Sequence, residues 1–258
     1  MGRFHRHDDG TVHEHHHGDH PHDHSHHDHG DHSGYETGRE RIEVLEDIFA
    51  ENDHCAAHNR DAFDAHNVQA INVMSSPGSG KTTVLQHVLA AAQAAGIRTG
   101  VIEGDIETSL DADRLGGYGA QISLLNTGNG FGGECHLDAP MVAAALSRLD
   151  LSALDLVLIE NVGNLVCPAE FEVGEHRKLM VYAVTEGEDK PLKYPVMFRS
   201  VGAVVVNKVD LLDFDRELFF ANLEKVNPGV PVFEVSAKTG EGMAELLRWF
   251  SPELKPEL

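Results

Sequence analysis

Short apolar runs alternate with longer amphipathic segments over most of the chain after residue 68. Short runs rich in Val, Ile and Leu predict buried strands, and apolar residues spaced three or four apart predict helices. The predicted strands span residues 70–74, 97–103, 121–125, 154–160, 179–185, 201–207 and 232–235, and the predicted helices span 81–95, 138–149, 214–226 and 242–250. This alternation predicts an α/β fold with a mostly parallel sheet flanked by helices. The phosphate loop described below assigns it to the P-loop NTPase class.

A helical lead-in, residues 38–67, precedes this domain. Apolar residues such as Ile42, Leu45 and Phe49 recur there at helical spacing and predict one or two amphipathic helices. His54 and His58 lie four residues apart and could share a metal ion, although solvated polar positions are the simpler interpretation. The chain is therefore divided into residues 1–37, the lead-in at 38–67, and a P-loop domain at 68–258.

The tail formed by residues 1–37 has almost no apolar side chains, so it is predicted to be disordered. Most of the 19 histidines of the chain lie in it. Imidazole suits nickel, zinc and copper, which favours a metal store. A purification tag is the alternative, but tag histidines are contiguous, whereas these alternate with aspartates. The tail histidines are His5, His7, His13, His15, His16, His17, His20, His22, His24, His26, His27, His29 and His32.

Composition and charge exclude some classes of binding partner. A formal net charge of −22 at pH 7 argues against binding to nucleic acid or to an anionic membrane, because both need a basic surface. The chain has 3 cysteines, an odd number that suits a reducing compartment rather than a disulfide framework. No apolar run is long enough to span a bilayer. We therefore expect a cytoplasmic protein.

A phosphate-binding loop follows the first predicted strand, Ser75-Ser76-Pro77-Gly78-Ser79-Gly80-Lys81-Thr82-Thr83, with Ser75 where the general pattern has glycine. Its backbone N–H groups are expected to surround the β-phosphate at the positive end of a helix. Lys81 is expected to act in catalysis by bridging the β- and γ-phosphates, and Thr82 to bind Mg²⁺. The nucleotide-binding residues predicted here are Gly78, Ser79, Gly80, Lys81, Thr82 and Thr83.

A base-recognition loop follows a later strand, at Asn207-Lys208-Val209-Asp210. The Asp210 carboxylate can accept two hydrogen bonds from guanine, whereas adenine would leave it unpaired. Asn207 would brace the loop, and the stem of Lys208 would lie against the purine. Ser236-Ala237-Lys238 follows the next strand and would place a backbone N–H near the guanine carbonyl. These elements predict GTP rather than ATP.

Two acidic strand ends lie between these loops. Asp105 and Glu160 follow strands whose carboxyl ends should face the nucleotide, so both are candidates for Mg²⁺ binding or for orienting the attacking water. Gly163 would sense the γ-phosphate through its backbone. Solvated acids at strand ends are the alternative for both carboxylates.

A second metal site is suggested by Cys135, His136 and Cys167, which follow predicted strands on the nucleotide side of the sheet. Two thiolates and an imidazole suit Zn²⁺ or Ni²⁺ and leave a position open for exchange. Buried cysteines that pack as small hydrophobic residues are the alternative.

Taken together, the motifs resemble the nickel-incorporation GTPases of hydrogenase maturation, the HypB family. Besides the phosphate loop and the base loops, the resemblance rests on four further stretches. They are Glu103-Gly104-Asp105-Ile106, Cys135-His136-Leu137-Asp138-Ala139, Glu160-Asn161-Val162-Gly163-Asn164-Leu165-Val166-Cys167-Pro168 and Lys190-Pro191-Leu192-Lys193-Tyr194-Pro195. The resemblance covers essentially residues 70–250. The chain lacks the cysteine-rich N-terminal nickel motif that some members carry.

The resemblance implies a Mg²⁺-dependent GTPase that forms a homodimer with nucleotide and helps to insert nickel into [NiFe]-hydrogenase. It also implies that Cys135, His136 and Cys167 form the domain metal site, that Lys193 reaches the nucleotide of the other subunit, and that Leu211 is a dimer contact. A partner nickel chaperone and the hydrogenase large subunit are the implied recipients. The alternatives are a urease accessory nickel-delivery GTPase, whose metal motif is Cys-Pro-His, and a non-enzymatic nickel or zinc storage protein.

Overall fold

A computed structural model describes residues 5–6, 12–13, 37–104, 115–125, 136–211 and 214–256. The chain forms two compact units, Met1–Glu43 and Val44–Leu258. In the first unit, strand β1 (His5–Arg6) pairs antiparallel with strand β2 (Val12–His13). A ladder this short is marginal in water. The rest of the tail that was predicted to be disordered lies outside the described residues, so that interpretation stays a prediction.

A sheet of 7 strands forms the centre of the second unit, in the order β5-β4-β6-β3-β7-β8-β9. Every pairing in it is parallel. The strands are β3 (Gln69–Ser75), β4 (Thr99–Glu103), β5 (Gln121–Leu124), β6 (Leu156–Gly163), β7 (Arg177–Ala183), β8 (Ala203–Asn207) and β9 (Val232–Glu234). The predicted α/β class with a parallel sheet is therefore confirmed.

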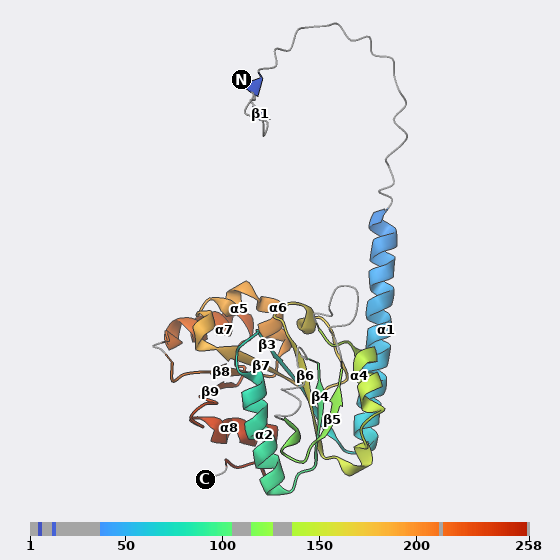
Figure 1. The fold of residues 1–258 in the computed structure, drawn as a ribbon, viewed down its shortest axis with the longest axis vertical. Coiled ribbons are helices and arrows are strands. Elements are labelled where there is room, and N and C mark those ends of the chain that lie inside the picture. Colours follow the sequence, from blue (N-terminus) through green and yellow to red (C-terminus); the bar gives the residue numbers. More distant parts are fainter. Residues whose placement is uncertain are drawn as a thin grey trace. The chain divides into compact units, whose positions relative to one another are not determined.

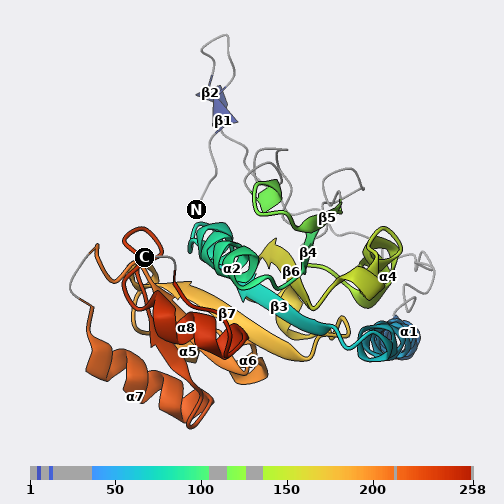
Figure 2. The same cartoon turned by 90° about the horizontal axis from the view of Figure 1, so that it is seen from below.

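Helices cover both faces of this sheet (Figures 1 and 2). On one face α2 and α8 pack on the central strands around buried residues such as Ile71, Val84 and Leu246. On the other face, Phe63 of α1 and Val142 of α4 cover the β4–β6 side, and α6 and α7 cover the β7–β8 side. The helices are α1 (Thr37–Ala65), α2 (Lys81–Ala95), α4 (Ala139–Leu146), α5 (Lys190–Lys193), α6 (Pro195–Ser200), α7 (Arg216–Val226) and α8 (Met243–Phe250).

Most predicted elements are present, with shifts at their ends. The lead-in is one helix, α1, rather than two. The predicted helix 138–149 is shorter, because Asp138 is the N-cap that accepts a hydrogen bond from the Met141 N–H, and a 3₁₀ turn at Leu151–Ala153 follows. Among the described helices, none combines the length and apolar character needed to cross a bilayer.

The parallel arrangement decides where a site can lie. Strands β3, β4, β6 and β8 all end at the same edge of the sheet, so the loops that follow Ser75, Glu103, Gly163 and Asn207 meet there. These loops carry the motifs singled out in the sequence.

Candidate functional site

The phosphate loop joins the end of β3 to the first residue of α2, Lys81. Gly78 and Gly80 adopt left-handed backbone conformations, with φ of 72° and 95°. At Gly80 a Cβ atom would lie only 2.5 Å from Nδ2 of Asn207. Only glycine therefore fits Gly80 without displacing Asn207, and the turn presents the N-terminus of α2 to the space above the loop.

Lys81 is buried at the start of α2, and its ammonium donates a hydrogen bond to the backbone carbonyl of Asn161. The same ammonium lies 3.5 Å from Oε1 of Glu160. Glu160 is only 1% exposed, so the ion pair is shielded from solvent.

Glu160 also lies beside Thr82, whose hydroxyl donates to Glu160 Oε1 at 2.7 Å. Within the described ranges, the buried Oε2 atom of Glu160 has no hydrogen-bond partner. A carboxylate oxygen and a hydroxyl oxygen are hard ligands of the kind that Mg²⁺ prefers, so this pair of residues fits that ion. Asp105, the other predicted carboxylate, lies outside the described residues.

Asn207 connects the phosphate loop to the base-recognition loops. Its Nδ2 donates to the Ser79 carbonyl at 2.9 Å, and its Oδ1 accepts from the Ala237 N–H at 3.0 Å. Lys208 has φ of 66° and donates from its ammonium to the Gly78 carbonyl at 2.6 Å. The carboxamide of Asn207 thus fixes the separation of the two halves of the site.

Asp210 accepts a hydrogen bond from the Ser236 hydroxyl on Oδ1 at 2.6 Å. The predicted loops enclose one hollow of about 150 Å³. Its lining residues are Gly80, Thr83, Asn207, Lys208, Asp210, Leu211, Ala237 and Lys238. His87 on α2 was not predicted. Its Nε2 lies 2.7 Å from the Ala237 carbonyl and supports the Ser236–Lys238 turn. No pattern in the sequence indicates this role of His87.

Asn161 is the residue that the sequence analysis most clearly undervalued. It is fully buried, and besides the Lys81 contact its Oδ1 accepts hydrogen bonds from the N–H groups of Leu137 at 3.0 Å and Val162 at 2.9 Å. Its Nδ2 donates to Oδ1 of Asn72 at 3.3 Å. Asn161 therefore joins Lys81 of the phosphate loop to the segment that begins at His136.

His136 lies next to the segment that follows Cys167. Its ring stacks on Phe171, with ring centroids 4.2 Å apart and planes inclined by 26°, and Cys167 opens the 3₁₀ turn Cys167–Ala169 four residues earlier. Cys135 lies outside the described residues. In the described part of the chain, no three His, Cys, Asp or Glu side chains converge as a metal-binding group, so the three-ligand site stays a prediction.

The remaining predicted residues are Lys193, Leu211 and Gly163. Lys193 on α5 is exposed and pairs with Asp189 at 2.6 Å, which raises the pKa of Lys193 through a hydrogen bond and the opposite charge. Leu211 lies at the rim of the hollow and is 52% exposed. Gly163 ends β6, four residues before Cys167.

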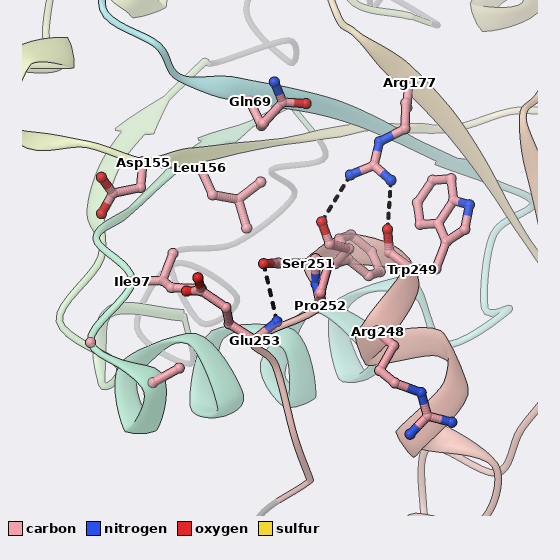
Figure 3. A pocket seen from close by; sticks show the side chains of 13 residues that line it. Gln69, Ile97, Asp155, Leu156, Arg177, Arg248, Trp249, Ser251, Pro252 and Glu253 are labelled. Carbon is pink, nitrogen blue, oxygen red and sulfur yellow. Dashed lines mark hydrogen bonds between the residues drawn. The ribbon is translucent and has the colours of Figure 1, made fainter.

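A larger hollow, of about 880 Å³, lies at the opposite edge of the sheet, where β3, β6 and β7 begin (Figure 3). Arg177 donates to the carbonyls of Trp249 and Phe250 at 2.5 and 2.8 Å and lies 4.4 Å from the centre of the Trp249 ring. These contacts hold the end of α8 against the sheet. This hollow lies at the amino ends of the strands, at the opposite edge of the sheet from the nucleotide loops. Ligands of parallel α/β sheets bind at the carboxyl ends, so this hollow is not the expected nucleotide site.

Comparisons with known proteins agree with this geometry. Residues 69–234 match the family described as CobW/HypB/UreG, nucleotide-binding domain. The chain is 48% identical over 213 residues to hydrogenase maturation factor HypB of Azotobacter vinelandii, covering 81% of this chain and 68% of that protein. It is 44% identical over 227 residues to HypB of Escherichia coli strain K12, covering 87% of this chain and 77% of that protein.

Two crystal structures of HypB share the fold. The Archaeoglobus fulgidus protein superposes with a TM-score of 0.71 at 35% identity, covering 78% of this chain and 97% of that one. Helicobacter pylori HypB, solved in complex with nickel, also gives a TM-score of 0.71, at 34% identity, covering 77% of this chain and 93% of that one.

Proposed function

The chain belongs to the CobW/HypB/UreG family, as a HypB hydrogenase maturation factor and P-loop GTPase, and on that premise we propose that it stores nickel and delivers it under GTP control. The recipient is the [NiFe]-hydrogenase large subunit, reached directly or through a partner nickel chaperone. The observation that carries the proposal is Asn161, which contacts the phosphate-binding lysine through its carbonyl and the Leu137 N–H through its side chain.

Guanine specificity rests on Asp210. The Ser236 hydroxyl holds one carboxylate oxygen and orients the carboxylate toward the hollow. Guanine offers two N–H donors to such a carboxylate, and adenine offers no matching pair. Asn207 and Lys208 connect this loop to the phosphate loop by hydrogen bonds. The base and the phosphates of one nucleotide would therefore bind to two loops that are held together.

Hydrolysis uses the phosphate-loop end of the same unit. Lys81 would bridge the β- and γ-phosphates of GTP, and the backbone N–H groups of Gly78 to Thr83 would surround the phosphates. Thr82, Glu160 and Asp105 would hold Mg²⁺, which supplies positive charge to the phosphates when bound. Glu160 already lies against Thr82, and with Asp105 it is the candidate for orienting the attacking water.

Coupling between GTP and the bound nickel ion, the cargo, follows from the hydrogen bond between Lys81 and the Asn161 carbonyl, which GTP would displace. The phosphates compete with the Asn161 carbonyl for the Lys81 ammonium, because a phosphate is the stronger acceptor. Loss of that bond frees the end of β6 to shift. The Asn161 side chain transmits the shift to Leu137 and so to His136. The proposed cargo site of Cys135, His136 and Cys167 would then change its affinity for nickel, and Zn²⁺ fits the same donors.

Dimerisation and storage complete the proposal. GTP would bring two copies together, with Lys193 reaching the nucleotide of the partner and exposed Leu211 in the contact. The tail histidines would hold nickel as the reserve. The nickel complex of the Helicobacter relative supports nickel as the metal.

The decisive experiment compares the Ni²⁺ affinity of the parent chain and of Lys81→Ala with GDP and with a non-hydrolysable GTP analogue. We expect the analogue to change the affinity of one site per chain in the parent only. The nickel capacity of the tail should stay the same in both proteins and serves as the internal control. If Lys81→Ala loses GTP turnover but still delivers nickel, the proposed coupling is wrong. The protein would then be a metal store whose GTPase activity is separate from nickel delivery.

A further inference from the structure

Helix α1 presents four residues of metal-binding types along one stripe. Glu51, His54, Cys55 and His58 occupy positions i, i+3, i+4 and i+7 of a continuous helix. The rings of His54 and His58 meet edge to face, with centroids 4.5 Å apart and planes at 77°. Both imidazoles are exposed, and Cys55 is a half-buried free thiol. The stripe is thus open to solvent and rich in donors.

Two histidines one helical turn apart can bind one metal ion together. Each metal–nitrogen bond is about 2.0–2.1 Å long, so the rings must approach as closely as these do. Among the described residues, neither ring is held by a hydrogen bond to the protein, so metal binding breaks no such bond. Solvated positions, the simpler interpretation of the sequence, do not require the two rings to be in contact.

The stripe is fixed beside the segment that carries His136. Two buried asparagines of α1 hold Ala139, with Asn52 Oδ1 accepting from its N–H and Asn59 Nδ2 donating to its carbonyl, both at 2.9 Å. Asn52 and Asn59 also donate to the carbonyls of Glu172 and Val173. These bonds connect α1 directly to the two segments that follow His136 and Cys167.

Ring stacking continues the same connection. Phe49 of α1 stacks on Phe171 with centroids 5.2 Å apart, and Phe171 stacks on His136. On the other side of the stripe, partial burial and the nearby charges of Asp138 and Glu51 raise the pKa of the Cys55 thiol. The two imidazoles are exposed and in contact with each other, whereas Cys55 is half-buried, so the imidazoles are the accessible donors.

We propose that His54 and His58 form a nickel-binding site on α1 that passes the ion from the histidine tail to the site at His136. Two imidazoles leave coordination positions open, which suits exchange rather than tight storage. In sequence the pair lies between the tail and His136, and in the structure it lies on the helix that is bonded to Ala139. The transfer role rests on the proposed function, whereas the two-histidine site does not.

The site is tested on the full-length chain with its thirteen tail histidines changed to Asn, titrated with Ni²⁺ alone. We expect His54→Ala to weaken one equivalent of Ni²⁺ by about 10²-fold, the order of the advantage of two linked donors over one. The matched control exchanges neighbours, Asp53→His with His54→Asp, which keeps the composition but moves one imidazole off the stripe. This exchange variant should lose as much affinity for Ni²⁺ as His54→Ala does. Unchanged binding in either variant would mean that the two histidines are merely solvated.

The transfer role is tested on the chain with its natural tail, loaded with less Ni²⁺ than the tail can hold. Arrival at a thiolate site gives a sulfur-to-nickel charge-transfer band that imidazole sites lack, and Cys55→Ser shows whether Cys55 contributes to it. We expect His54→Ala with His58→Ala to slow the rise of the band without changing its final height. An unchanged rate overturns the transfer role. If the parent shows no band, the thiolate cargo site of the proposed function and the transfer role both fall, and the titration still decides the two-histidine site.

Discussion

Single side chains at this site serve two partners each. Asn207 bonds both the phosphate loop and the Ser236–Lys238 turn, and the side chain of Asn161 bonds both Leu137 and Asn72. A carboxamide can do this because it carries a donor and an acceptor in one plane. Such residues are hard to identify from sequence, because asparagine at a strand end is equally common in solvated turns. Lys81, Thr82 and Asp210 were predictable, because each belongs to a motif with a known chemical role.

At Asp210, the proposed function predicts that the charge of the side chain selects the base. Asp210→Asn should weaken GTP binding by about 10²–10⁴-fold, since two hydrogen bonds to a charged acceptor are lost. The carboxamide offers an N–H to the C2 carbonyl of xanthine, so XTP should bind better to the variant than to the parent. Fluorescence competition with both nucleotides measures the exchange of preference. Equal losses for GTP and XTP would show that Asp210 acts only by holding Ser236.

At Gly80, both backbone conformation and space demand glycine. Gly78→Ala should cost about 1–2 kcal/mol of unfolding free energy, because its positive φ strains any side chain while the space around it is open. Gly80→Ala should cost more, because its Cβ would also displace Asn207. Urea unfolding without nucleotide measures both, and equal costs would contradict the role given to Asn207.

At the scale of elements, α2 and the central strands could be predicted, and the connections between them could not. Helix α2 begins at the phosphate-loop lysine and ends before Gly96, whose φ of 72° ends the helix in a left-handed turn. Helices α5 and α6 were not predicted, and at 4 and 6 residues they are too short to show a helical spacing of apolar residues. In the structure Pro191 and Pro195 stand in the first turns of these helices, where no N–H is needed.

Helix α4 offers a test of a cap beside the proposed cargo site. Asp138 accepts from the Met141 N–H at 2.8 Å. Asp138→Ala should lower the unfolding free energy by about 0.5–2 kcal/mol, and Asp138→Asn should restore most of it, because asparagine caps as well. Thermal unfolding in a metal chelator keeps bound ions out of the comparison. A loss of equal size in both variants would mean that the charge matters rather than the cap.

At the scale of the molecule, the fold gathers the loops with the nucleotide-binding motifs at one edge of the sheet and leaves several large apolar side chains exposed. Leu211 at the rim of the nucleotide hollow is 52% exposed, and Leu218 on α7 is 48% exposed. The resemblance to HypB proteins implies that the first is a dimer contact, and nothing in the sequence alone separates the two leucines.

Sedimentation of the two leucine variants with a GTP analogue measures which leucine contributes to dimerisation. Leu211→Asp should weaken the proposed nucleotide-dependent dimer by roughly 10- to 10²-fold, the equivalent of about 1.5–3 kcal/mol for exposing a buried leucine. Leu218→Asp is the matched control and should dimerise like the parent. Equal behaviour of the two variants would place the dimer contact elsewhere.

The carboxamide of Asn207 has a further consequence. Since it joins the two halves of the nucleotide site before any nucleotide arrives, the site is preorganised, and little chain entropy is lost on binding. Base and diphosphate should then bind with a small change in heat capacity, for GDP as for GTP. Whatever additional free energy the γ-phosphate provides is not consumed in assembling the pocket. Under the proposed coupling it stays available for breaking the bond between Lys81 and Asn161.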